Sequence, residues 1–124
     1  MTGRRQARQQ ALTLLYQWDL TGQPLGALFQ GEIDPFARSL AEAVAGRAEE
    51  LDTRITAAAT DWTADRLGVI ERNVLRIAIH EIDGTDVPVE VAIDEAVRLA
   101  KRFASAEAGA LVNGILGRIV AEAA

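Results

Sequence analysis

The sequence has no cysteine, one histidine (His80) and two serines (Ser39 and Ser105) among its 124 residues. The absence of cysteine excludes disulfides, thiolate zinc sites, iron–sulfur clusters and cysteine nucleophiles. A single histidine excludes a multi-histidine metal site and argues against a Ser–His–Asp triad. We therefore expect no catalytic residues and no metal site.

Long apolar runs are also absent, and none approaches the length needed to cross a bilayer, so we expect no membrane association. Hydrophobic residues make up 49% of the chain and charged residues 25%, which is the mix of a folded globular protein. The length fits one domain over residues 1–124.

Acidic residues are missing from the start of the chain. The net charge of −5 argues against nucleic-acid binding, but no acid precedes Asp19, and Arg4, Arg5 and Arg8 give residues 1–18 a charge of +3. A cationic end on an acidic body indicates one local anion-facing surface. An organelle transit peptide is the alternative reading of this segment, and its apolar helical face argues against that reading.

Apolar residues recur at helical spacing through most of the chain, which predicts an all-α fold. We expect a compact bundle of about five to seven helices. The predicted helices cover residues 4–20, 35–59, 69–82, 89–103 and 105–119, with a loop at 21–34 and a turn or short helix at 61–67. Asp34 before Pro35 and Ser105 are predicted helix caps.

The segment 69–82 is apolar around more than half of its helical circumference, which places it in the middle of the bundle. Glu81 projects into that apolar arc, and Glu71 also interrupts it. A carboxylate in the position of Glu81 must find a cation, reach solvent at the helix end or face a partner. A general acid–base role is the weaker reading, because neither a companion histidine nor a metal cluster accompanies it.

Two surfaces carry groups that suit RNA. Arg5, Arg8, Leu12 and Tyr16 share one side of the first helix, where arginine would take phosphate and tyrosine would stack on a base. The alternative is a solvated arginine pair with Tyr16 packed at the edge of the core. A second basic cluster contains Arg98, Lys101 and Arg102, and the i, i+4 spacing of Asp94 and Arg98 favours a self-neutralised face there.

Small residues line one stripe of the last helix, at Ala110, Gly114, Gly117 and Ala121. Such a stripe lets two helix backbones approach closely. We expect an intramolecular helix crossing there, with a dimer interface as the alternative.

Four segments together resemble the NusB family of bacterial transcription antitermination factors: RRQARQQALTLLYQWDL at 4–20, IERNVLRIAIHEI at 70–82, VPVEVAIDEAVRLAKRF at 87–103 and LVNGILGRI at 111–119. They follow the family's order and spacing and cover about half of the chain. The resemblance implies an all-helical fold of two small sub-bundles, a cytoplasmic location, no enzymatic activity and no cofactor.

The resemblance also implies binding of boxA-type single-stranded RNA of ribosomal RNA leader transcripts, together with the ribosomal protein NusE, within an RNA polymerase antitermination complex that reads through terminators. Carried over by position, the RNA-binding residues are Arg4, Arg5, Arg8, Tyr16, Lys101, Glu107 and Leu111, and the NusE-facing residues are Glu71, Arg76 and Glu81.

The sequence departs from the family at two of these places. Leu111 stands where phenylalanine is frequent, and Gln6 where a further arginine is common. Losing a stacking platform weakens RNA binding, so we expect greater reliance on NusE. Contacts to about three or four phosphates predict a salt slope of roughly −2 to −3 for single-stranded RNA, and a slope near roughly −6 would contradict that count.

Two alternatives come from other functional classes. One is a protein–protein interaction module, or a homodimer that hides the RNA-binding face. The other is a detached accessory domain of a ribosomal RNA methyltransferase, although the chain has no glycine-rich cofactor loop and no cysteine nucleophile.

Overall fold

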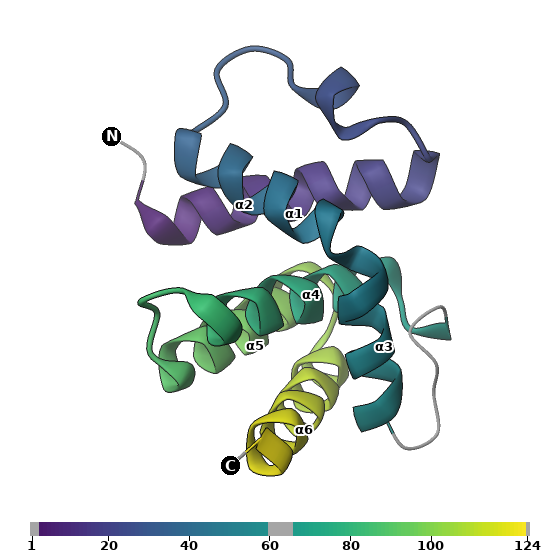
Figure 1. The fold of residues 1–124 in the computed structure, drawn as a ribbon, viewed down its shortest axis with the longest axis vertical. Helices are drawn as coiled ribbons and strands as arrows, with labels where there is room; N and C mark the ends of the chain where they lie inside the picture. Colours follow the sequence, from purple (N-terminus) through teal and green to yellow (C-terminus); the bar gives the residue numbers. More distant parts are fainter. Residues whose placement is uncertain (1–2, 60–65, 124) are drawn as a thin grey trace.

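The computed structural model describes residues 3–59 and 66–123, and within these ranges the fold is all-α (Figure 1). The six α-helices and one 3₁₀ turn of the described residues agree with the predicted helical bundle. The elements are α1 (Arg4–Thr21), η1 (Leu25–Leu28), α2 (Pro35–Gly46), α3 (Ala48–Ala58), α4 (Val69–Gly84), α5 (Val89–Phe103) and α6 (Ala106–Ala123). Of the turn expected at 61–67, residues 61–65 lie outside the described ranges.

Helix α4 is the centre of the molecule, as its apolar circumference predicts. It contacts each of the other five α-helices. Figure 1 shows α1 and α2 lying together on one side of it, while α5, α6 and α3 pack around the rest. Residues 73–79 of α4 are all buried, and the apolar side chains of the whole bundle form one connected core. No described helix is long and apolar enough to cross a membrane.

Two predicted caps are confirmed. The Asp34 carboxylate accepts hydrogen bonds from the backbone N–H groups of Phe36 at 2.9 Å and Ala37 at 3.3 Å, and Pro35 opens α2. The Ser105 hydroxyl accepts from the N–H of Ala108 at 3.0 Å and starts α6. Each side chain satisfies N–H groups that have no partner inside the helix.

The single helix expected over 35–59 is wrong, because the chain breaks at Arg47. The backbone of Arg47 has φ −109° and ψ 8°, and its N–H reaches back only three residues, to the carbonyl of Val44 at 3.1 Å. Gly46, a weak helix former, precedes the break. The change of direction lets α2 pack on α1 while α3 packs on α4 and α6.

The intramolecular crossing expected at the small-residue stripe of α6 is also wrong. Ala110, Gly114, Gly117 and Ala121 are exposed, and a Cβ added to either glycine would meet no atom within 4 Å. The helix packs through a different side, because its larger apolar residues occupy the core. These are Val112, Ile115, Leu116 and Ile119.

The cap of α2 gives a direct test of the local structure. We expect Asp34→Ala to lower the free energy of unfolding by about 1 kcal/mol, because two N–H groups lose their acceptor. Asp34→Asn, which keeps an acceptor oxygen, should stay within a few tenths of wild type. Urea denaturation followed by circular dichroism measures both, and equal losses for the two variants would contradict the capping role.

Candidate RNA and partner interface

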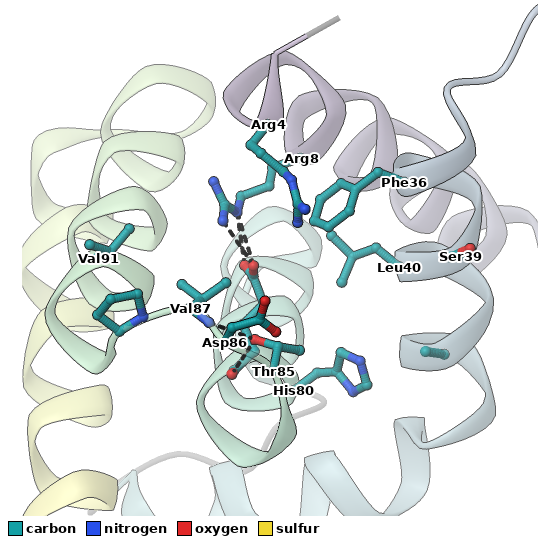
Figure 2. A pocket seen from close by; sticks show the side chains of 13 residues that line it. Arg4, Arg8, Phe36, Ser39, Leu40, His80, Thr85, Asp86, Val87 and Val91 are labelled. Carbon is teal, nitrogen blue, oxygen red and sulfur yellow. Dashed lines mark hydrogen bonds and ion pairs between the residues drawn. The ribbon is translucent and has the colours of Figure 1, made fainter.

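The start of α1 is tied to the end of α4 by a buried ion pair. The Arg8 guanidinium donates to both carboxylate oxygens of Glu81, with Nε–Oε1 and Nη2–Oε2 distances of 2.9 Å (Figure 2). Arg8 is only 6% exposed and Glu81 only 2%. The sequence left three possibilities for Glu81: a cation, solvent at the helix end or a partner. In the structure, Glu81 pairs with a cation, Arg8.

This pair corrects the expected RNA-facing ridge on α1. The ridge required Arg8 and Leu12 to face solvent, but both are buried, and the Arg8 guanidinium is engaged inside the molecule. Helical spacing places Arg8 and Leu12 on one side of α1, but the presence of an arginine does not make that side face solvent. A buried carboxylate needs a cation, and Arg8 supplies it.

Arg4 and Arg5 remain at the surface beside this pair. Arg5 donates to Glu95 on α5, with an Nη2–Oε1 distance of 2.8 Å, and its side chain is 54% exposed. The hydrogen bonds from Arg5 lower the pKa of the Glu95 carboxyl, against the opposing effect of burial. The Arg4 guanidinium lies over the ring of Phe36, 4.1 Å from its centroid. Both cations are thus held in place with part of their donor surface facing solvent.

A groove of about 590 Å³ opens next to these cations, between α1, α2 and the turn that joins α4 to α5. Figure 2 shows Phe36 and Leu40 on one side and Val91 on the other, with Arg8 and Val87 between them, and Glu81 also lines the groove. The walls are apolar and the rim is charged, a combination suited to flat or amphipathic groups.

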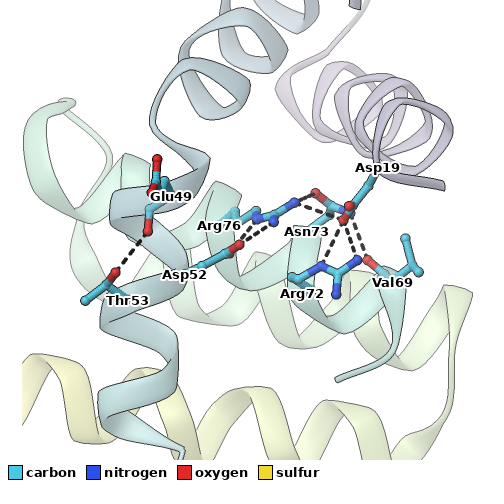
Figure 3. Close-up of polar contacts among 8 residues, drawn as sticks. All are labelled: Asp19, Glu49, Asp52, Thr53, Val69, Arg72, Asn73 and Arg76. Carbon is cyan, nitrogen blue, oxygen red and sulfur yellow. Dashed lines mark hydrogen bonds and ion pairs between the residues drawn. The ribbon is translucent and has the colours of Figure 1, made fainter. Parts of the chain in front are cut away.

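In the middle of α4, Arg76 is also inside the protein. It is 4% exposed and bridges two helices, binding Asp52 of α3 at 2.6 Å and Asp19 of α1 at 2.9 Å (Figure 3). Arg72 and Asn73 bind the same Asp19 carboxylate. Two of the three residues expected to face NusE, Arg76 and Glu81, are therefore engaged in buried intramolecular pairs.

Glu71, the third of them, is half-buried in the first turn of α4. Its carboxylate lies against Gly68, where an added Cβ would come 2.6 Å from Oε2. The positive end of the helix dipole also stabilises a negative charge at this position. Glu71 is thus the member of the predicted NusE-facing set that stands nearest the surface.

The other predicted RNA-binding residues lie on α1, α5 and α6. Lys101 and Glu107 are exposed, whereas Tyr16 and Leu111 are half-buried, and Leu111 packs against the core. The aliphatic stem of Lys101 crosses Gly109, where an added Cβ would come 2.6 Å from its Cγ. Gly109 therefore lets Lys101 lie close along the start of α6.

Several polar residues that organise these surfaces escaped the sequence reading. Asp19, Asp52 and Glu95 each bind an arginine of another helix. The sequence held one usable signal for them. Arg72, Asn73 and Arg76 are clustered on a helix that must be central, and buried cations there require acidic partners on neighbouring helices.

The geometry defines a class of protein: an all-α bundle whose central helix is held to its neighbours by buried ion pairs, with exposed cations at the start of one helix and the end of another. Within the described ranges, no three histidine, aspartate or glutamate side chains gather in a way that could hold a metal ion. Such a surface binds through charge and shape.

Comparison with known proteins narrows the class. The NusB family model matches residues 5–121. A transcription antitermination protein NusB from Anaeromyxobacter sp. (strain Fw109-5) is 38% identical over 95% of this chain and 90% of its own. One from Geobacillus kaustophilus (strain HTA426) is 39% identical over 95% of both. A chain in a crystal structure of antitermination factors NusB and NusE in complex with double-stranded RNA has a TM-score of 0.81, with 31% identity over 96% of both chains.

The chain belongs to the NusB family of transcription antitermination proteins. The resemblance read from the sequence is thereby confirmed, and so is its all-helical fold.

The buried pair between α1 and α4 can be tested by a double-mutant cycle. We expect Arg8→Met to cost about 3–5 kcal/mol of unfolding free energy, because Glu81 is left buried without a cation. The double variant Arg8→Met/Glu81→Met should recover much of that loss, since no unpaired charge remains.

Arg38→Met is the matched control, because it breaks the exposed Arg38–Glu42 pair and should cost ~0–1 kcal/mol. Urea denaturation supplies all the values. A cost for Arg8→Met no larger than that of Arg38→Met would show that the pair is not a structural requirement.

Proposed function

We propose that this protein binds boxA-type single-stranded RNA of ribosomal RNA leader transcripts together with the ribosomal protein NusE, and so supports read-through by RNA polymerase. The observation that carries the proposal is the similarity, over 96% of the chain, to a chain in the structure of NusB and NusE with RNA. The antitermination role of the family's curated members gives it a cellular context.

The surface cations support RNA as the ligand. Arg4 and Arg5 are exposed at the start of α1, and Lys101 is exposed at the end of α5. Arginine offers several donors to phosphate oxygens, and an ion pair on one edge leaves others available. Arg8 is left out of the proposed RNA-binding set because Glu81 occupies it inside the protein. These three cations contribute about −2 to the salt slope on single-stranded RNA.

Tyr16 favours unpaired bases over a duplex. An aromatic ring can stack only on a base that is free of its own helix, and sequence-specific RNA readers use such contacts. The related crystal structure holds double-stranded RNA, so the choice between the two forms is part of the test. Tyr16 is half-buried, and its hydroxyl forms no hydrogen bond within the described part of the chain. The ring is therefore the part of Tyr16 that we expect to act.

The proposed NusE-binding surface narrows to the start of α4. Of Glu71, Arg76 and Glu81, only Glu71 lies outside the buried ion pairs that join the helices. We place Glu71 in the NusE interface and assign Arg76 and Glu81 to holding α4 in position. A variant of Glu71 should then weaken the complex with NusE without unfolding the protein.

The direct experiment is fluorescence anisotropy of a labelled boxA RNA titrated with the protein, with and without NusE. We expect sequence-selective binding that tightens with NusE, and weaker binding to a scrambled strand and to a duplex. Tyr16→Ala should lose roughly 1–3 kcal/mol, or about 5- to 150-fold in Kd, because a stacking contact is removed. Tyr16→Phe keeps the ring and should bind like wild type.

Arg118→Ala is the control for the cations, since Arg118 is exposed on α6 and pairs with Glu122 of its own helix. It should leave RNA binding unchanged, while Arg5→Ala weakens it. Equal binding of boxA and scrambled RNA, even with NusE present, would refute the proposed function.

A further inference from the structure

The second basic cluster, on α5, is not neutralised as the sequence reading expected. Of the basic side chains that the structure describes, those without an ion pair are Arg4, Arg66, Arg98, Lys101 and Arg102. Three of these five lie within one and a half turns of α5. Asp94 is spaced to pair with Arg98, but the pair does not form among the described residues. Unpaired cations on a chain of net charge −5 form a local anion-facing surface.

Arg98 and Arg102 belong to one strip of α5, together with Val91 and Glu95. The spacing i, i+4, i+7 and i+11 places these four residues within about 60° around the helix and along about 16 Å of its axis. Val91 borders the groove that Arg4 also lines, and Glu95 holds Arg5. The strip therefore begins at the cations of α1 and leads away from them along α5.

Helices α1 and α5, which carry these cations, run in the same direction and are joined by the Arg5–Glu95 ion pair. Ion pairs join residues 8 and 81 at one end of α1 and residues 19 and 72 at the other, so α1 and α4 are antiparallel. Since α4 and α5 form a helical hairpin, α1 and α5 run the same way across the molecule, as Figure 1 shows. Arg102 thus lies toward the same end of the molecule as Tyr16.

Arg98 and Arg102 are exposed, and neither is held by a carboxylate of residues 3–59 or 66–123. Arg98 lies three residues after Glu95 on α5, and it adds to the lowering of the Glu95 pKa that the Arg5 hydrogen bonds chiefly cause. The Arg102 guanidinium lies 5.2 Å from the centre of the Phe103 ring, and Phe103 is 43% exposed. A guanidinium beside an exposed ring is a common combination in proteins that bind single strands.

We propose that Arg98 and Arg102 bind the phosphates of a single-stranded RNA that passes from the start of α1 along α5. The inference rests on the proposed RNA-binding function and extends it to two residues outside the set carried over from the family. In this arrangement both residues contact the phosphates of the RNA backbone. They therefore add affinity and make RNA binding more salt-dependent without reading the base sequence.

The test is the salt dependence of RNA binding by wild type and by the double variant Arg98→Gln/Arg102→Gln. Five cations, Arg4, Arg5, Arg98, Lys101 and Arg102, predict a slope of about −3.5 for wild type, and the double variant should fall to about −2. Between about 50 and 200 mM salt, wild type should then lose about 130-fold in affinity and the variant about 16-fold. Binding is measured on boxA RNA and on the scrambled strand.

The matched control is Arg38→Gln/Arg118→Gln, which removes the same charge from two exposed arginines on α2 and α6. It should keep the wild-type slope, and circular dichroism should show all variants folded. An unchanged slope in Arg98→Gln/Arg102→Gln, or an equal fall in the control, would overturn the inference.

The outcome also separates this inference from the proposed function. A loss of slope on both RNAs, with no preference of wild type for boxA, would support the phosphate contacts and refute boxA selectivity. A preference for boxA RNA, with the same salt slope in wild type and in Arg98→Gln/Arg102→Gln, would support the proposed function and refute the phosphate contacts.

Discussion

Buried charge on the central helix is the constraint on which the arrangement of this protein depends. Arg76 and Glu81 lie on α4 among apolar side chains, and neither is more than 4% exposed. Because an unpaired charge in such a position is strongly destabilising, α4 requires partners of opposite sign from its neighbours. Asp19 of α1 and Asp52 of α3 meet Arg76, and Arg8 of α1 meets Glu81. Helix α1 is thus fixed to α4 at two points along its length.

That fixation decides what α1 shows to solvent. With Arg8 turned inward, Arg4 and Arg5 are left at the surface, where Phe36 and Glu95 orient them. The same fixation makes α1 and α5 run the same way across the molecule, and the Arg5–Glu95 ion pair joins the two helices. A structural pair and a binding surface are therefore adjacent on one helix, and residue type alone does not separate them.

The sequence predicted those parts of the fold that depend on local chemistry. Helical periodicity located the helices, and Asp34 and Ser105 correctly predicted the starts of α2 and α6. The apolar circumference of 69–82 identified the central helix. It failed where the outcome depends on tertiary contacts. The break at Arg47 follows from where α2 and α3 must pack, and the exposure of Gly114 and Gly117 follows from the larger side chains on the core side of α6.

In the candidate site, too, the sequence missed the features that depend on tertiary contacts. Family resemblance brought Arg4, Arg5, Tyr16 and Lys101 into view, and these remain accessible or half-buried. It could not show that Arg8 is engaged by a residue 73 positions away. Nor could helix spacing alone show that Asp94 and Arg98 stay apart, because an exposed pair gains little from forming and other contacts decide it.

The central claim is that Arg8 holds the fold together while Arg4 and Arg5 meet the ligand. Nuclear magnetic resonance of isotope-labelled arginine side chains tests it most directly, by following the Nε–H signals as boxA RNA is added. The account predicts that the Arg8 signal is protected from exchange with water and does not move, while the signals of Arg4 and Arg5 shift. An Arg8 signal that exchanges rapidly and shifts with the others would contradict it.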